Sequence, residues 1–317
     1  MNVLSALRRS GVLGINRRNA EFTLRWNPRS AYPMVDDKLR TKELCLRAGI
    51  PTPRLLAVAR HHFELRRLRA AMAELTSFVL KPARGAMGNG IVVVRERDGA
   101  RFRLAGGRSL SLDDLSYHAA GVISGLYALA GQTDAAIVEE RLLVHPELAC
   151  IATEGVPDVR VIVYRGVPVM AMTRLPTLRS SGRANLHQGA VAAGIDLESG
   201  RTTHAILDGR PIRRHPDTGA ALIGHAIPGF GDVLGYALRA ADETGLGYVG
   251  ADLVVDAERG PVLLEMNARP GLMIQVANRA GLLPRLRAID REIAPGRSVA
   301  ERIALAVSIA RQTAAAA

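Results

Sequence analysis

The chain has 317 residues, of which 48% are hydrophobic and 23% charged, a composition that indicates a globular protein and excludes a disordered one. Aromatic residues make up only 4%, which argues against a stacking platform for single-stranded nucleic acid. The formal net charge is +12, and arginine dominates the basic residues. This charge is compatible with a solvated basic surface or with an acidic partner: a nucleotide, an acidic peptide or an anionic membrane surface.

Two cysteines, Cys45 and Cys150, are too few for a metal cluster, and we expect both to be reduced packing residues of a cytoplasmic protein. No stretch approaches the roughly 18 to 20 apolar residues that span a bilayer. Residues 1–35 carry arginine pairs at 8–9 and 17–18 but no cleavage site. We expect a short basic segment that packs on the main domain, with membrane-surface contact as the less favoured alternative.

The expected elements follow in chain order. Residues 35–53 contain a helix that Asp36 or Asp37 caps and that Gly49, Pro51 and Pro53 end. A strand near 53–58, a helix near 61–75 and a strand–turn–strand unit over 77–97 come next. A helix over 111–131, strands over 135–142 and 147–153, a hairpin over 158–174 and a polar stretch over 178–194 follow. A helix near 232–244, a second hairpin over 248–272 and a last helix near 299–317 complete an α+β protein.

The second hairpin places polar groups inside an apolar strand. Glu265 and Asn267 lie two residues apart, so they share one face of the strand. If the turn is centred between Glu258 and Arg259, Asp252 lies directly opposite Glu265. Two adjacent carboxylates are unfavourable unless a cation lies between them, and Mg²⁺ prefers oxygen ligands. The alternative is a solvent-facing hairpin with incidental acids.

Glycines punctuate the segment KPARGAMGNG, which includes Gly85, Gly88 and Gly90. It joins two strands and lacks a closing Gly-Lys-Ser/Thr, so it fits neither a P-loop nor a dinucleotide fingerprint. A glycine-rich hairpin can fold over phosphates, and Lys81 at its entry would reach the same groups. The alternative is a simple turn.

The segment 136–147, AIVEERLLVHPE, begins as an apolar strand and continues into charged residues. Its backbone at Glu139, Glu140, Arg141 and Leu142 could face an adenine edge, and Glu147 could accept ribose hydroxyls. An edge strand that enters a charged loop is the alternative.

Arg160 alternates with core valines in DVRVIV, and a basic residue in such a strand needs an anionic partner. Arg174, Arg183 and Asn185 follow, and arginine forks bind carboxylates and phosphates bidentately. Surface salt bridges are the alternative for each arginine taken alone.

Taken in order, these motifs resemble the ATP-grasp superfamily, in particular its α-L-glutamate ligase-related branch, which includes the ribosomal-protein glutamate ligase. The resemblance spans about residues 35–275 and implies two α+β subdomains that clamp ATP, over residues 36–134 and 135–317. It implies that Lys38, Lys81 and the flap 83–90, with Gly85, Met87, Gly88, Asn89 and Gly90, bind ATP phosphates. It also implies that Asp252, Glu265 and Asn267 hold one or two Mg²⁺ ions, for which Mn²⁺ could substitute.

The implied activity is an ATP-dependent carboxylate–amine ligase that works through an acyl phosphate. Arg160, Arg174, Arg183 and Asn185 would bind the carboxylate, and glutamate or a related amino acid would be added to an acidic peptide or small acceptor. Only 37 residues precede Lys38, so the usual preceding domain is expected to be largely missing and a partner protein or second subunit could fill its place. An ATP-grasp kinase of an anionic small molecule and a non-catalytic ATP-binding regulator are the alternatives, and nucleic acid is not an expected partner.

Overall fold

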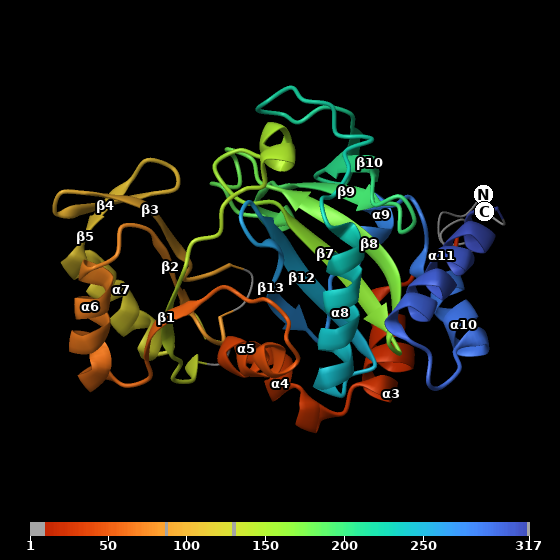
Figure 1. Ribbon diagram of the computed structural model, residues 1–317, viewed down its shortest axis with the longest axis horizontal. Helices are drawn as coiled ribbons and strands as arrows, with labels where there is room; N and C mark the ends of the chain where they lie inside the picture. The colour runs from red at the N-terminus through yellow and green to blue at the C-terminus, as the bar shows by residue number, and fades with distance from the viewer. Residues whose placement is uncertain (1–9, 86–87, 129–130, 316–317) are drawn as a thin grey trace.

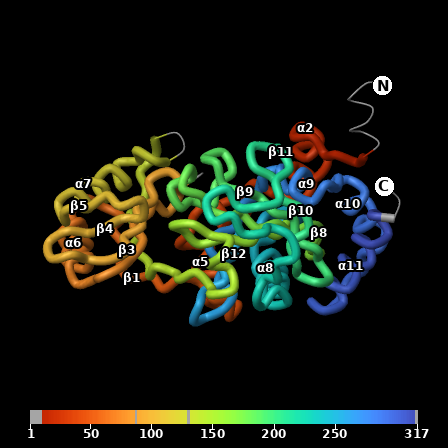
Figure 2. The backbone as a smooth tube through the Cα atoms, turned by 90° about the horizontal axis from the view of Figure 1, so that it is seen from above, coloured from red at the N-terminus to blue at the C-terminus, as the bar shows by residue number. Residues whose placement is uncertain are grey.

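The computed structural model describes residues 10–85, 88–128 and 131–315. Within these residues the chain forms two antiparallel sheets, each with its own helices, and Figures 1 and 2 show the smaller sheet and its helices at one end of the molecule. None of the helices formed by the described residues is long and apolar enough to cross a membrane. The α+β class predicted from the sequence is confirmed.

The smaller sheet has the strand order β1-β6-β2-β3-β4-β5. Helices α6 and α7 pack on the sheet face formed by Phe78, Leu80 and Val138, and this face is fully buried. The opposite face is therefore left to carry polar groups. The elements are β1 (Leu55–Ala59), α6 (Leu65–Ala73), β2 (Phe78–Pro82), β3 (Val92–Asp98), β4 (Arg101–Leu104), β5 (Ser109–Ser111), α7 (Leu112–Ile123) and β6 (Ala136–Glu139).

The larger sheet has the order β11-β10-β9-β8-β7-β12-β13 and contains the main hydrophobic core. Helices α8, α10 and α11 pack against its central strands, and Figure 1 shows α8 running across the sheet. The elements are β7 (Asp158–Tyr164), β8 (Val167–Leu175), β9 (Val191–Ile195), β10 (Thr202–Leu207), β11 (Arg210–Ile212), α8 (Phe230–Thr244), β12 (Tyr248–Asp256), β13 (Gly260–Asn267), α9 (Ile274–Ala277), α10 (Leu282–Glu292) and α11 (Val299–Ala315).

The described part of the N-terminal segment packs on the larger sheet. It forms short helical turns, α2 (Ile15–Arg17), η1 (Arg18–Thr23), α3 (Leu24–Trp26), η2 (Arg29–Ala31) and α4 (Pro33–Asp36). The Phe22 ring meets Tyr164 edge-on at 5.5 Å between ring centroids. Asn27 joins the segment to the edge of the core, because its side-chain amide donates to the carbonyls of Tyr248 and Ala268 and its oxygen accepts from the Tyr248 amide.

Helix α5 (Lys38–Arg47) has the ends that the sequence predicts. The Asp37 side chain accepts a hydrogen bond from the Leu39 amide at 3.0 Å and so caps the helix, and Gly49 has a φ of 64°, a value that favours glycine. Its buried residues Leu44 and Cys45 join the core of the larger sheet. The helix thus lies between the two sheets and belongs by packing to the larger one (Figure 1).

Both hairpins form where predicted, although the second turn differs in detail. In the first, Arg165 and Gly166 both have positive φ, which suits a two-residue turn. In the second, Asp256 pairs with Gly260, so the turn is centred on Glu258 and not between Glu258 and Arg259. A register shift after Asp252 compensates, and Asp252 still faces Glu265 as predicted.

Three further details differ from the sequence predictions. Residues 147–153 are not a strand, because Pro146 starts the short helix η5 (Pro146–Ile151), whose first free amide, that of Glu147, is bound by the His145 ring. Strand β6 pairs with β1 and β2, so the smaller sheet extends past the expected boundary at residue 134. Cys45 is buried, and its burial raises the pKa of the thiol to about 11, but Cys150 is exposed and not a packing residue.

We predict that Asn27→Ala lowers the free energy of unfolding by about 2 to 3 kcal/mol, because it leaves buried backbone groups of β12 without partners. Urea denaturation monitored by circular dichroism measures the change. The exposed Asn16→Ala is the matched control, and equal effects of the two substitutions would contradict the role given to Asn27.

Candidate functional site

A cleft of about 1950 Å³ separates the polar face of the smaller sheet from the larger sheet. Most of the residues singled out from the sequence line it: Lys38, Lys81, Gly85, Gly88, Gly90, Glu139, Glu140, Arg141, Leu142, Arg160, Arg174, Arg183, Asn185, Asp252, Glu265 and Asn267. Asn89 and Glu147 are exposed and do not line the cleft, and Met87 lies outside the described residues. The folding pattern therefore brings segments that are far apart in sequence to one cavity.

The centre of the smaller sheet's cleft face is a buried carboxylate shared by two lysines. Glu139 Oε2 lies 2.5 Å from Lys81 Nζ, and Glu139 Oε1 lies 3.0 Å from Lys42 Nζ. All three side chains are less than 10% exposed. Burial would raise the pKa of Glu139, but the two ammonium groups outweigh it and lower that pKa below its ordinary value.

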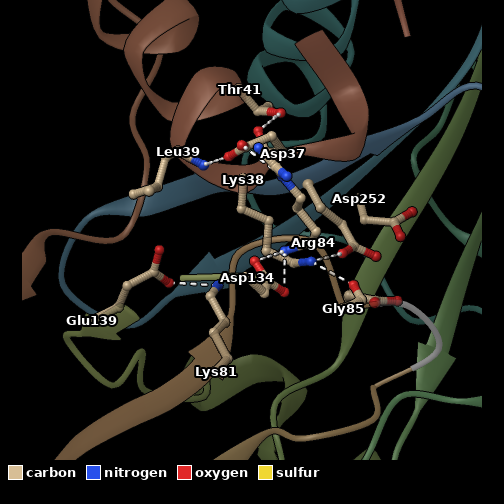
Figure 3. Close-up of polar contacts among 12 residues, drawn as sticks. Asp37, Lys38, Leu39, Thr41, Lys81, Arg84, Gly85, Asp134, Glu139 and Asp252 are labelled. Atoms are coloured by element: carbon tan, nitrogen blue, oxygen red, sulfur yellow. Dashed lines mark hydrogen bonds and ion pairs between the residues drawn. The ribbon is translucent and has the colours of Figure 1, made fainter. Parts of the chain in front are cut away.

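Lys38 extends from the start of α5 into the cleft. Figure 3 shows it between Glu139 on one side and Asp252 on the other. Its Nζ donates to the Gly85 carbonyl at 2.8 Å and lies 3.8 Å from Glu265 Oε2. Burial lowers the pKa of Lys38, although Glu265 opposes the change. Lys38, Lys42 and Lys81 are the three lysines of the sequence, and all three converge here.

Hydrogen bonds hold the start of the glycine-rich segment to Asp134 and to the start of helix α5. The Asp134 carboxylate accepts from the amides of Arg84 and Ala135, and the Lys38 amide donates to the Ala83 carbonyl at 2.9 Å. At the other end, a Cβ on Gly90 would lie 2.6 Å from the Tyr127 ring, and the φ of Gly90 is 75°. Only glycine fits this close approach without displacing the ring.

On the opposite wall, three charged residues form a row across neighbouring strands. Asp252 on β12 lies between Arg160 on β7 and Glu265 on β13. Arg160 holds the Asp252 carboxylate with two hydrogen bonds, 2.7 Å from Nε to Oδ1 and 2.5 Å from Nη2 to Oδ2. Asp252 and Glu265 are directly opposite each other in the ladder, so their side chains lie on the same face of the sheet.

A second arginine–carboxylate pair adjoins this row. Arg174 on β8 binds Asp158 on β7 through both guanidinium edge nitrogens, and its Nη2 also lies 2.9 Å from Asp252 Oδ2. Burial raises the pKa of Asp158 to about 6, although Arg174 lowers it. Burial would also raise the pKa of Asp252, but Arg160 and Arg174 together lower it to about 2. Both acids are buried, and Asp252 is bound by two guanidinium groups whereas Asp158 is bound by one.

Asn267 continues the same face of β13 and lies opposite Gly250. A Cβ at Gly250 would come 2.8 Å from Pro270 and about as close to the Asn267 amide, so glycine leaves room for both. Arg18 of the N-terminal segment is buried and donates to the Pro270 carbonyl at 2.8 Å. The loop after β13 is therefore held from behind by residues that precede α5.

The segment after β6 crosses from the smaller sheet to the larger one. The Glu140 carboxylate binds Arg54 beside β1 and Arg259 at the turn of the second hairpin, so it links the two sheets. The backbone amide of Leu142, a residue 8% exposed, forms no hydrogen bond within the described part of the chain. Buried backbone amides are almost always paired, so a ligand acceptor group is expected here.

The remaining predicted residues lie on the loop before β9. Asn185 Oδ1 accepts from the His187 amide at 3.0 Å and starts the short helix η6 (Leu186–Gln188). Arg183 is exposed, with its Nη1 3.5 Å from the Gln188 side chain. Both face the cleft but neither contacts the arginine–carboxylate pairs in any described interaction.

A family model described as sugar-transfer associated ATP-grasp matches residues 17–291. The chain belongs to the sugar-transfer associated ATP-grasp family. A comparison with curated proteins gave no significant match. The motifs that resemble ATP-grasp proteins thus lie in a chain of that superfamily.

Several solved structures of ATP-grasp proteins and ligases are similar to this chain. The ATP-grasp ligase PsnB, complexed with a minimal precursor, is 20% identical, with a TM-score of 0.46 over 84% of this chain and 64% of that one. The D-cycloserine synthetase DcsG is 14% identical, with a TM-score of 0.45 over 82% of this chain and 73% of that one. The D-Ala:D-Ser ligase VanG from Enterococcus faecalis is 15% identical, with a TM-score of 0.45 over 86% and 61%. This chain spans less than two thirds of the length of the PsnB chain.

Sequence reasoning missed two charged residues of the site. Lys42 follows Lys38 by one helical turn, and the i, i+4 spacing of two lysines on a buried helix face was a signal that could have revealed it. Asp158 stands two residues before Arg160 and therefore on the same face of β7. In addition, Arg160 and Arg174 have partners within the protein, Asp252 and Asp158, that their sequence context did not identify.

The donor set on the larger sheet fits a divalent cation. Arginines bind both oxygens of the Asp252 carboxylate, whereas the Glu265 carboxylate is 41% exposed and lies 3.8 Å from Lys38 Nζ, so it is accessible to a cation. Asn267 adds a neutral oxygen on the same face. No group of three or more His, Cys, Asp or Glu among the described residues is placed to hold a metal, so an ion here would depend on the amide, water and substrate oxygens.

We predict that Lys42→Met lowers the free energy of unfolding by about 3 kcal/mol, because it removes one of the two partners of the buried Glu139 carboxylate. Urea denaturation measures this change. Arg40→Met, on the exposed side of the same helix, is the control and should change stability little. A Lys42→Met protein as stable as the Arg40→Met protein would contradict the role of Lys42.

Asp158 gives a pH prediction. Its pKa is higher in the folded protein, at about 6, than in the unfolded chain, so the folded state binds the proton more tightly and stability falls as pH rises from about 4 to about 6. The free energy of unfolding, measured by urea denaturation at pH 4.5 and 7, should fall between these pH values by about 2 to 3 kcal/mol less in Asp158→Asn than in the wild type. The exposed Asp113→Asn should keep the wild-type slope, and an unchanged slope in Asp158→Asn would refute the prediction.

Proposed function

We propose that this protein is an ATP- and Mg²⁺-dependent carboxylate–amine ligase that forms an amide bond. The observation that carries the proposal is the convergence of Lys38 and Lys81 on one side of the cleft and Asp252, Glu265 and Asn267 on the other. Cations on one side and oxygen ligands on the other suit a nucleotide triphosphate with its metal. Membership of an ATP-grasp family supports this assignment.

Each wall would then have a defined task. Lys38 and Lys81 would bind phosphate oxygens, with the segment 83–90 above them and the unpaired Leu142 amide available to the adenine edge. Glu265 and Asn267, with Asp252 behind them, would hold Mg²⁺, which neutralises charge on the phosphates. Glu139, on the same cleft face of the smaller sheet, would keep Lys81 in place.

The arginines of the larger sheet would receive the substrate carboxylate. Arg160 and Arg174 offer the guanidinium edges that are not bound to Asp252 and Asp158, and Arg183 and Asn185 extend the same wall on a loop. The carboxylate oxygen would take the γ-phosphoryl group of ATP, and an amine would then displace phosphate. Water must be kept from the activated carboxyl group, which is the task we assign to the glycine-rich segment.

For the substrates, we propose glutamate or a related amino acid and an acidic peptide or small acceptor. A net charge of +12 and a cleft with many arginines support anionic substrates. The similarity of the quoted motifs to glutamate ligase-related proteins supports the amino acid.

The test is turnover. Protein incubated with ATP, Mg²⁺, pooled amino acids and acidic peptides should release ADP and phosphate only when an acceptor is present. Release of ADP without phosphate would instead identify a kinase, and ATP binding without ADP production would identify a regulator.

We predict that Glu265→Gln lowers acceptor-dependent ADP release at least about 100-fold, because it removes a charged metal ligand. Glu258→Gln, at the exposed turn of the same hairpin, is the matched control. Similar activity in the two variants would exclude Glu265 from the metal site.

A further inference from the structure

The side chains of two arginines at the outer end of the cleft have no role so far. On the smaller sheet, Val79 pairs with Val93 on one side and with Glu139 on the other. Arg95 lies two residues beyond Val93, and Arg141 lies two residues beyond Glu139. Because side chains alternate along extended chain, both follow the cleft face that carries Lys81, and both line the cleft.

Neither guanidinium group forms an ion pair with a carboxylate of the residues that the structure describes. Arg141 forms no hydrogen bond or ion pair with any described residue, and its Nε is buried without a partner. The charge of Arg95 lies close enough, together with burial, to lower the pKa of Arg141. Two neighbouring guanidinium groups, one half-buried and unpaired, are unfavourable unless an anion binds between them. The Glu139 carboxylate cannot serve, because Lys42 and Lys81 occupy its two oxygens.

The contacts of Arg95 indicate which ligand would supply this anion. Arg95 Nη2 donates to the Glu154 carbonyl of the larger lobe at 2.6 Å. Glu154 and Gly155 pack backbone to backbone against Gly182, because a Cβ on Gly155 would come 1.8 Å from the Gly182 carbonyl oxygen. Gly182 directly precedes Arg183, on the loop that the proposed function assigns to binding of the substrate carboxylate. The arginine pair therefore adjoins that loop, on the outer side of Glu139 away from Lys81.

We propose that Arg95 and Arg141 form a second anion subsite, which binds a phosphate or carboxylate group of the acceptor other than the group that reacts. The assignment of this anion to the acceptor rests on the proposed function. The subsite itself requires only that an oxyanion bind between the two guanidinium groups. Guanidinium pairs bind both phosphate and carboxylate through paired N–H donors. The acceptor would thus carry at least one anionic group besides its amine or carboxylate.

The experiment measures binding to the full-length protein saturated with Mg²⁺ and a non-hydrolysable ATP analogue, so that the nucleotide phosphate position is filled. Inorganic phosphate and glutarate are titrated separately at constant ionic strength by calorimetry. We expect one saturable site, and Arg95→Gln or Arg141→Gln should weaken it by at least about tenfold. The probe that binds more tightly identifies the anion as phosphate or carboxylate.

Arg67→Gln removes the same charge from α6, on the other face of the smaller sheet, and should bind the probes as the wild type does. Without a probe, Arg141→Gln should melt at the wild-type temperature or above, because it relieves like-charge repulsion. Failure of both probes to saturate, unchanged affinity in Arg141→Gln, or a lower melting temperature for it would overturn the subsite. Probe binding without ligation would refute only the proposed function, whereas ligation without probe binding would refute only this inference.

Discussion

The structure of the cleft depends on the ion pairs of one buried carboxylate, that of Glu139. A charge in this position is tolerated only when it is matched, and it is matched by ammonium groups from two different elements, α5 and β2. This arrangement joins a helix that packs with the larger sheet to a strand of the smaller sheet. It also explains why lysine persists in a chain that otherwise uses arginine: the ammonium is compact, and two of them fit around one carboxylate where guanidinium forks would not.

On the opposite wall of the cleft, buried carboxylates are also paired with cationic side chains, which here are arginines. Asp158 and Asp252 are buried among strands that otherwise carry valine, alanine and methionine, and each is neutralised by a guanidinium from the neighbouring strand. These pairs leave Glu265 as the acid that faces the open cleft. The wall therefore presents one accessible carboxylate in a rigid frame, and not three equivalent ones.

Residue patterns within single strands and helices were sufficient to predict much of this arrangement. The period of two along β13 and the facing strand placed Asp252 beside Glu265, and the caps of α5 were correct because Asp37 and Gly49 act on their own helix. The turn was misplaced because the side chain of Asp256, which accepts from the amides of Glu258 and Arg259, selects a different turn, and an added residue in the opposite strand restored the register. The partner of Glu139 on α5, and those of Arg160 and Arg174, depend on contacts between segments roughly 15 to 100 residues apart, which no local pattern encodes.

The two ion pairs of Glu140 have a consequence for how the two sheets are joined. One carboxylate is gripped by Arg54 from the smaller lobe and by Arg259 from the larger, at the point where the chain passes between them. Glu140 therefore joins the two sheets at this crossing, and they cannot separate there without breaking both ion pairs.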